Sequence, residues 1–269
     1  MSASPLLKRY DAEVRGWTGT PAPGFRIERA GAITRLIGPG PEAHGNAVLH
    51  AELKASDADS AIADQVAFFG ALGHSFEWKH YSHDLPPDLP GRLREAGFVA
   101  EEPETLVALD TAREWPSKPL PDEVRIERLV DPASLGVITV VNGAVYGDTD
   151  HASWLAGTII QEKRADPDSI DIYAAYEQDR PISVGWMRHK RGDAFGSLWG
   201  GSTLPEWRSR GVYSALVAIR AARARERGCR WLTVDCSPMS LPILTRRGFQ
   251  PLSVITPFIW ASTRGRPQP

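Results

Sequence analysis

The stretch Leu204–Leu216, LPEWRSRGVYSAL, joins a predicted strand to a predicted helix and decides the fold of this chain. The apolar run Phe195–Leu204 predicts a strand, and Pro205 ends its pairing because proline has no amide hydrogen to donate. Apolar residues then recur at helical spacing over 212–227. The chain therefore passes from strand to helix through the short turn Arg208–Gly211.

This turn has the chemistry of a phosphate site. The first amides of a helix have no acceptor within the helix, and the aligned peptide dipoles leave partial positive charge there. Gly211 lets backbone approach a ligand closely, and Arg208 and Arg210 add charge and donors suited to a pyrophosphate. Arginines before a helix are more often simply solvated, so the prediction depends on the strand and the amphipathic helix that flank them.

The elements around this motif follow the order strand, two helices, three antiparallel strands, helix, strand, helix and two strands. The predicted strands are 124–129, 172–176, 182–187, 195–204, 230–236, 249–254 and 258–260. The predicted helices are 132–146, 152–163, 212–227 and 241–247.

The first half of the chain shows a related pattern. It predicts strands at 25–30, 33–37, 47–53, 75–81 and 98–109 and helices at 57–72 and 84–96. LREAGF (93–98) and LTRRGF (244–249) are both helix ends that run into strands. They are either two ordinary strand–helix units or the trace of a duplicated fold with one eroded copy. A proline-rich linker at 111–121 predicts domains at 1–110 and 122–262, with a loose tail at 263–269.

The stretch Val124–Trp260 resembles the GNAT superfamily, the GCN5-related N-acetyltransferases. TLPEWRSRGVYSAL resembles the family's acetyl-CoA motif, Q/R-x-x-G-x-G/A after the fourth strand, and SPMSLPILTRRGF (237–249) resembles its later N-x-x-S-x-x-x-Y-x-x-x-G-F motif. The resemblance implies an α/β (α+β) fold with a mixed, mostly antiparallel sheet flanked by helices. Residues 1–110 resemble the later part of the same fold. They have only Lys54–Ser56 where the phosphate turn would be, so this half is expected to be degenerate.

The resemblance also implies acetyl-CoA (coenzyme A) as the cofactor. Backbone groups of Ser202 and Thr203 would contact the pantetheine arm and the thioester carbonyl, and amides from Arg208 to Ser214 would hold the pyrophosphate. Ser237 stands where the family often has Asn. The implied cofactor residues are Ser202, Thr203, Arg208, Ser209, Arg210, Gly211, Val212, Tyr213, Ser214 and Ser237.

Two residues depart from the family pattern. Tyr213 stands where the cofactor motif has a small residue, so its ring must point away from the phosphates or use its hydroxyl on them. Leu244 stands where the family often has Tyr, the usual candidate acid for the leaving thiolate. That role must pass to another group, to water or to nothing, and the ordinary thiol pKa near 8.5 makes unassisted departure feasible.

Candidate catalytic residues are therefore Ser240, Asp235 and Glu206. Each has a simpler interpretation: Glu206 as a dipole partner at a helix start, and Asp235 as an ordinary strand residue. His189 is expected to be solvated, and Cys236 to be a small buried hydrophobe rather than a nucleophile. Elsewhere, Tyr146, Asp148 and Asp150 could receive a cationic acceptor or form a loop with a helix cap.

Composition narrows the class of protein. The chain has 269 residues and a formal net charge of -2, which argues weakly against nucleic acid as a partner. Two cysteines without a CxxC pair give no zinc site and fit reduced thiols. No apolar run is long enough for a signal peptide or a membrane span. We expect a cytoplasmic monomer or homodimer without a membrane partner.

Three functions follow from these observations. The first is N-acetyl transfer from acetyl-CoA to the primary amine of a small or amino-acid-like molecule. The second is an acyl-CoA-binding sensor or regulatory module without turnover, slightly favoured by Leu244. The third is an α/β protein with no CoA site, for which CoA would cause no thermal shift.

Overall fold

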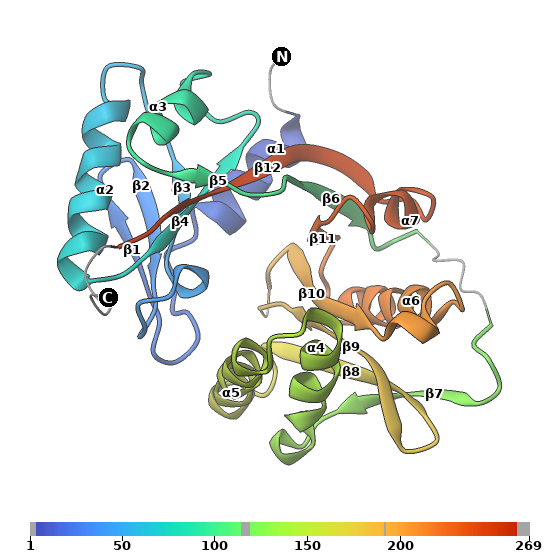
Figure 1. The fold of residues 1–269 in the computed structure, drawn as a ribbon. Helices are drawn as coiled ribbons and strands as arrows, with labels where there is room; N and C mark the ends of the chain where they lie inside the picture. The colour runs from blue at the N-terminus through green and yellow to red at the C-terminus, as the bar shows by residue number, and fades with distance from the viewer. Residues whose placement is uncertain (1–3, 114–118, 191, 263–269) are drawn as a thin grey trace. The chain divides into compact units, whose positions relative to one another are not determined.

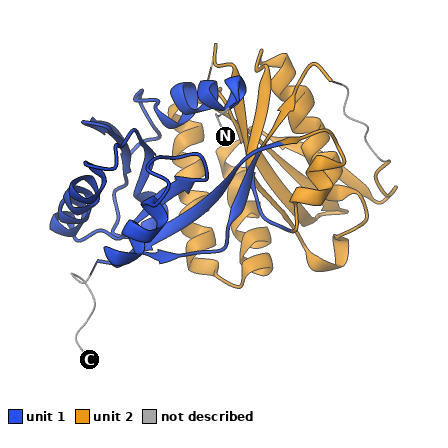
Figure 2. Ribbon diagram, turned by 90° about the horizontal axis from the view of Figure 1, so that it is seen from above, with its two compact units in different colours: residues 1–106, 235–238, 251–269 blue, residues 107–234, 239–250 orange. Residues whose placement is uncertain are grey.

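The structure is a computed structural model that describes residues 4–113, 119–190 and 192–262. It divides into two compact units, coloured separately in Figure 2. Unit 1 comprises residues 1–106, 235–238 and 251–269, and unit 2 comprises residues 107–234 and 239–250. These units interleave along the chain, whereas the division at 111–121 expected from the sequence is contiguous and stays a prediction. The predicted tail and residues 114–118 of the predicted linker lie outside the described residues.

Unit 1 is built on a sheet with the strand order β1-β2-β3-β4-β12, and β5 pairs with β12. The pairs β1–β2, β2–β3, β4–β12 and β5–β12 are antiparallel, and β3 pairs with β4 in parallel. Its strands are β1 (Arg26–Ala30), β2 (Ile33–Ile37), β3 (Ala47–Ala51), β4 (Phe76–Tyr81), β5 (Val99–Ala100), the start of β6 (Glu104–Asp110) and most of β12 (Gln250–Trp260). Its helices are α1 (Pro5–Tyr10), η1 (Asp11–Arg15), η2 (Ala43–Gly45), α2 (Ala58–Leu72) and α3 (Leu89–Glu95).

The unit 1 core consists of aromatic and aliphatic side chains from the sheet and from α2 and α3. Phe69 stacks on Phe76 with ring centroids 4.3 Å apart, and Trp78 is fully buried in the same cluster. The N-terminal segment contributes a buried ion pair, in which the Arg15 guanidinium binds both carboxylate oxygens of Asp84 at 2.8 and 2.9 Å. Unit 1 therefore has a complete core of its own.

Unit 2 contains the sheet order β7-β8-β9-β10-β11, with the later part of β6 beside β11. Every pair from β7 to β10 is antiparallel, and β10 with β11 is parallel. Its strands are β7 (Val124–Leu129), β8 (Ile170–Glu177), β9 (Arg180–Arg188), β10 (Phe195–Thr203) and most of β11 (Trp231–Cys236). Its helices are η3 (Pro132–Gly136), α4 (Val137–Tyr146), α5 (Thr149–Ala165), η4 (Pro205–Trp207), α6 (Val212–Glu226) and α7 (Leu241–Thr245). Figure 1 shows α4 and α5 on one face of this sheet and α6 on the other.

The predicted elements are found in order, and several differ in extent. The strand predicted over 98–109 is two strands, β5 and β6. The helix predicted over 84–96 begins only at Leu89, after two prolines. The helix predicted over 132–146 is a 3-10 turn followed by α4. The two strands predicted at 249–254 and 258–260 are one strand, β12. It continues through Pro257 because that residue's carbonyl still accepts a hydrogen bond from the Glu101 amide at 2.9 Å.

The two GF segments noticed in the sequence have the same local geometry. Gly97 and Gly248 are left-handed, with φ of 90° and 96°. The amide of Phe98 donates a hydrogen bond to the Leu93 carbonyl at 3.0 Å, and the amide of Phe249 donates one to the Leu244 carbonyl at 3.1 Å. Such closures end a helix and turn the chain into a strand. In both units a helix also follows a strand of a parallel pair, α2 after β3 and α6 after β10, so the repeat extends beyond these two segments.

The corresponding helix starts carry opposite charge. Asp57 is the N-cap residue of α2, and Asp59 lies in its first turn. The first turn of α6 has no acidic residue, and Arg208 and Arg210 precede it. Carboxylates repel a phosphate where arginines attract it. This contrast supports the expectation that only the second half holds a nucleotide cofactor.

Within the described residues, no helix is long and apolar enough to cross a membrane.

Candidate cofactor and active site

The turn before α6 has the backbone geometry of an anion site. Ser209 and Gly211 both have positive φ, 63° and 91°, on either side of Arg210. The first hydrogen bond of the helix runs from the Ala215 amide to the Gly211 carbonyl at 2.9 Å. The amides of residues 212–214 precede it, in the turn where a helix offers no internal acceptor. Gly211 gives this helix start no side-chain N-cap, which suits it to an anion.

Arg208 and Arg210 are exposed on this turn. The Arg208 Nε donates to the Thr203 carbonyl at 3.2 Å, and the Arg210 guanidinium lies 4.8 Å from the Trp207 ring centroid. Trp207 is itself buried against Val212 in a small apolar cluster. The turn is therefore anchored to the core by Trp207, while Arg208 and Arg210 are exposed.

Tyr213, the departure from the small residue of the motif, directs its ring toward the sheet. A Cβ added at Gly201 would lie 3.0 Å from the Tyr213 Cε2 atom. The ring therefore covers the glycine of β10, where a larger residue would collide with it. This is the first of the two arrangements expected from the sequence, with the ring turned away from the phosphate turn.

The parallel strands β10 and β11 pair at their N-terminal ends and diverge toward their C-terminal ends. In the described residues their pairing runs over Phe195–Ser197 and Trp231–Thr233, and β10 is bulged between Gly200 and Ser202. The bulge leaves Gly201 as the extra residue, and both Gly200 and Gly201 have positive φ, 68° and 83°. A bulge re-aims backbone groups out of the ladder, and diverging parallel strands expose backbone that a linear group can contact.

The side chains of Ser202 and Thr203 are occupied by other residues. The Ser202 hydroxyl donates to Asn142 Oδ1 at 2.6 Å and lies 3.4 Å from the Tyr146 hydroxyl. The Thr203 hydroxyl lies 2.7 Å from that of Ser183, which donates to the Ser202 carbonyl at 2.7 Å. Any contact with a cofactor would therefore use the remaining backbone groups, and the backbone contacts expected from the sequence stay a prediction. Tyr146, 69% exposed, brings a hydroxyl to this strand end.

An ion cluster fixes the far end of α6 to the sheet. Asp171 on β8 has a fully buried side chain and binds Arg128 at 2.8 Å, Arg223 at 3.1 Å and His189 at 3.1 Å. Burial, the largest single influence, raises the pKa of Asp171, but the His189 hydrogen bond and the charges of Arg128 and Arg223 outweigh it, and the net pKa is low. The expectation that His189 is solvated is wrong, because its ring is buried and its Nε2 lies 3.1 Å from the Asp171 carboxylate.

The candidate catalytic residues of unit 2 lie in different settings. Glu206 accepts from the Arg180 guanidinium at 2.6 Å, and its own backbone amide together with Arg180 holds the pKa of Glu206 below its usual value. Ser240 precedes α7, and its carbonyl accepts the Ile243 and Leu244 amides at 3.0 Å. Leu244 is fully buried. Asp148 caps α5 by accepting from the His151 amide at 2.8 Å, so the simpler interpretation holds for it.

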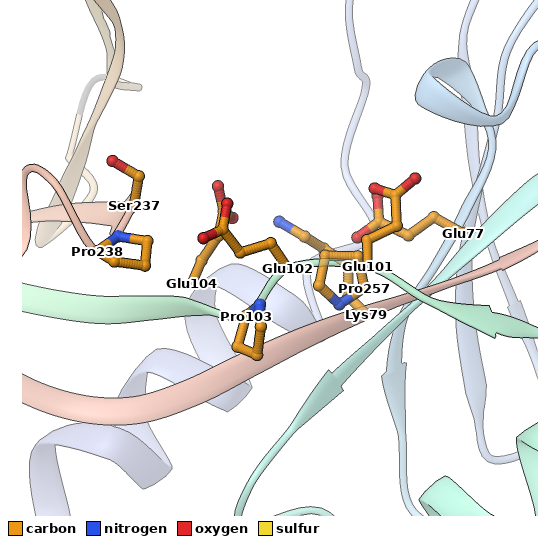
Figure 3. A pocket seen from close by; sticks show the side chains of 9 residues that line it. All are labelled: Glu77, Lys79, Glu101, Glu102, Pro103, Glu104, Ser237, Pro238 and Pro257. Atoms are coloured by element: carbon orange, nitrogen blue, oxygen red, sulfur yellow. The ribbon is translucent and has the colours of Figure 1, made fainter.

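Asp235 and Ser237 belong to unit 1, where Ser237 lines an acidic pocket (Figure 3). The cavity has a volume of about 340 Å³, and its charged and polar lining includes Glu77, Lys79, Glu101, Glu102, Glu104 and Ser237. Lys79 donates to Asp235 at 2.8 Å. Burial lowers the pKa of Lys79, but the charges of Asp235 and Glu77 outweigh it and raise the net pKa. Burial, reinforced by the charge of Asp235, raises the pKa of Glu104 to about 7.

Both cysteines are buried. Burial, with the charge of Asp193, raises the pKa of Cys229 to about 11, and burial, with the charge of Glu104, raises the pKa of Cys236 to about 11.

Because the thiolate is the reactive form, we expect native protein at pH 8 to react with a disulfide reagent at least ten times more slowly than denatured protein. Absorbance at fixed reagent concentration measures this. Rapid reaction of two thiols in the folded state would contradict it.

Several residues of the site escaped the sequence reasoning. In unit 2, the Asn142–Ser202 hydrogen bond and the burial of Arg220 depend on contacts between segments distant in the sequence. In unit 1, the same holds for Glu104 beside the pocket. The bulge had a signal, because the consecutive glycines Gly200 and Gly201 interrupt a predicted strand.

No protein-family model matches the chain, and no curated protein matches it. Solved structures do match. A GCN5-related N-acetyltransferase from Kribbella flavida superposes with a TM-score of 0.68 at 15% identity, covering 87% of this chain and 88% of that chain. A GCN5-related N-acetyltransferase from Sphaerobacter thermophilus superposes with a TM-score of 0.61 at 12% identity, covering 93% of this chain and 84% of that chain. A tandem GNAT protein from the clavulanic acid biosynthesis pathway gives 0.60 at 11% identity over 89% and 84%.

Proposed function

We propose that this chain, which has the GNAT fold, transfers an acetyl group from acetyl-CoA to the primary amine of a small or amino-acid-like molecule. The observation that carries the proposal is the open start of α6, reached through Ser209 and Gly211 and flanked by two exposed arginines. That arrangement suits the diphosphate of coenzyme A in charge and in its close backbone approach.

Unit 2 supplies the remaining parts of such a site. The diphosphate would bind residues 208–214, and the pantetheine arm would run along backbone where β10 and β11 diverge. The thioester carbonyl would then lie near the bulge at Gly200–Ser202. Acetyl-CoA would supply the activated acyl group, and the protein would hold that carbonyl against an incoming amine.

Transfer then needs one bond made and one broken. The amine nitrogen attacks the carbonyl carbon, negative charge develops on the carbonyl oxygen, and the carbon–sulfur bond breaks. A backbone amide directed at that oxygen contributes about 3 kcal/mol to stabilising the transition state. The amine proton passes to water or to a nearby base, and the thiolate can leave unassisted because thiols have a pKa near 8.5.

The candidate bases differ in what the structure offers them. Glu206 is a weak base because its pKa is lowered and Arg180 occupies it. Within unit 2, Ser240 at the start of α7 stays a candidate, whereas Asp235 belongs to unit 1, where Lys79 holds it. The acceptor would meet the exposed Tyr146 and the acidic start of α5 at Asp150.

Thiol release on mixing with acetyl-CoA and a panel of amines tests the proposal. We expect stoichiometric CoA release and acetylated amine, with at least one acceptor raising the rate ten-fold or more above hydrolysis. Product mass and thiol absorbance measure it, and protein without amine is the control. CoA binding without release for any amine would reject the transferase.

That second outcome defines the alternative function, an acyl-CoA-binding sensor without turnover. The observation that favours it is Leu244, which is fully buried where the family often has a Tyr hydroxyl. Both functions require CoA binding, so absence of a thermal shift with CoA would reject the two together.

A further inference from the structure

Arg220 lies in the middle of α6 and is buried, and within the described part of the chain it forms no ion pair with an acidic side chain. It is 1% exposed, and among the described residues its hydrogen bonds all go to backbone carbonyl oxygens. Burial lowers the pKa of Arg220 to about 10, so the guanidinium stays charged at neutral pH. Burying a cation without an anionic partner costs desolvation free energy, so the hydrogen bonds that Arg220 makes in return must stabilise the structure around it.

The guanidinium joins three elements at one point. Its Nε donates to the Leu216 carbonyl of the same helix at 2.9 Å. Its Nη1 donates to the carbonyls of Trp186 on β9 and Trp199 on β10, both at 3.1 Å. Trp199 is the residue directly before the bulge glycines. Arg220 therefore links the helix that begins at the phosphate turn to the strand that carries the bulge.

The glycines around Arg220 make room for it. A Cβ at Gly185, on β9, would lie 2.7 Å from Nη1 and 2.9 Å from the central guanidinium carbon, closer than real contacts allow. A Cβ at Gly201 would lie 3.9 Å from Nη2. Nη2 therefore lies beneath the extra residue of the bulge, and none of the hydrogen bonds described above uses it.

We propose that Arg220 is a positioning residue for acyl transfer: its guanidinium fixes the β10 bulge in the shape that receives the thioester carbonyl and places positive charge beneath it. The inference rests on the proposed function. As the amine attacks and the carbon–sulfur bond breaks, the carbonyl oxygen gains negative charge. A fixed cation in a water-poor setting stabilises that charge without having to reorganise.

The bound thioester itself reports on this role, whatever the acceptor is. With carbonyl-labelled acetyl-CoA, the isotope-edited infrared band of the carbonyl should move to lower frequency on binding wild-type protein, because a nearby cation polarises the bond. In Arg220→Met the shift should be lost, while CoA affinity stays within about three-fold because the phosphate turn is retained. Arg220→Lys keeps the charge and should keep part of the shift.

Gly185→Ala is the second test, because it displaces the guanidinium without removing it. Its matched control is Gly196→Ala on the neighbouring strand, where a Cβ would make only ordinary contacts of 3.4 Å or more. We expect Gly185→Ala to lose the shift and Gly196→Ala to keep it. In the amine assay, Arg220→Met should lower kcat about 100-fold with KM for acetyl-CoA little changed.

The outcomes separate the two proposals. If wild-type protein does not bind acetyl-CoA, the proposed function fails first. If wild-type protein binds and polarises the carbonyl while Arg220→Met behaves identically, the role of Arg220 is rejected and the function stands. Should Arg220→Met fail to fold, a wild-type shift in Gly185→Ala rejects that role equally.

Discussion

Replacing Gly211 with Glu should abolish coenzyme A binding while leaving the protein folded, with affinity falling at least 100-fold. The substitution places a carboxylate at the front of α6, where the diphosphate would bind, and like charges repel there with little screening at contact distance. It also removes the residue whose φ of 91° any side chain adopts only with strain. Calorimetric titration with CoA measures the affinity, and circular dichroism measures the fold.

Gly228→Glu is the matched control for this result. Gly228 lies just beyond the other end of the same helix with a similar φ of 85°, and a Cβ there would meet nothing within 4 Å. It therefore bears the same backbone strain and the same added charge, away from the phosphate turn. Wild-type affinity in Gly211→Glu, or an equal loss in both variants, would contradict the assignment of the cofactor site.

Asp171→Asn should lower the free energy of unfolding of unit 2 by about 3–5 kcal/mol, the range seen when one partner of a buried charge network is removed. The side chain is fully buried, and its removal would leave Arg128, Arg223 and His189 without their shared anion. Urea unfolding followed by tryptophan fluorescence measures the change. Asp168→Asn is the control, because Asp168 pairs with Arg227 while 82% exposed and should matter little.

The Asp171 cluster also predicts how the free energy of unfolding changes with pH. Burial raises the pKa of Asp171, yet His189 and the arginines lower it more, so the folded-state pKa lies below the unfolded value near 3.9. This stabilisation is therefore complete above about pH 4 and is lost as pH falls through the folded pKa. The stability difference between wild type and Asp171→Asn should shrink below pH 4. A difference that stays constant from pH 7 to pH 3 would contradict the proposed network.

Local patterns in the sequence were enough to predict most of the fold. Apolar spacing and the two left-handed glycines that end α3 and α7 identified the helices and the repeat. The strand through Pro257 was missed because proline normally interrupts a ladder, and only the partner strand shows that its carbonyl is still used. The order of the helices and strands was therefore predictable from the sequence, whereas the residues at which they begin and end depend on pairing between strands that are distant in the sequence.

The site was predictable only where it is local. Residues 208–214 are contiguous, so their geometry follows from a strand, a turn and a helix start. Arg220 gave no such signal, since an arginine on a helix normally faces water and its burial depends on glycines from β9 and β10. His189 was misjudged for the same reason, because its partner Asp171 lies on a different strand.

The interleaving of the two units has a consequence for dissecting the protein. β12, supplied by the last residues of the chain, lies between β4 and β5 in the sheet of unit 1. A fragment cut after residue 113 would lose that strand and leave the β4 edge open to other chains. The earlier half of the chain is therefore not a self-sufficient piece, and the later half must be synthesised before the earlier half can complete its sheet.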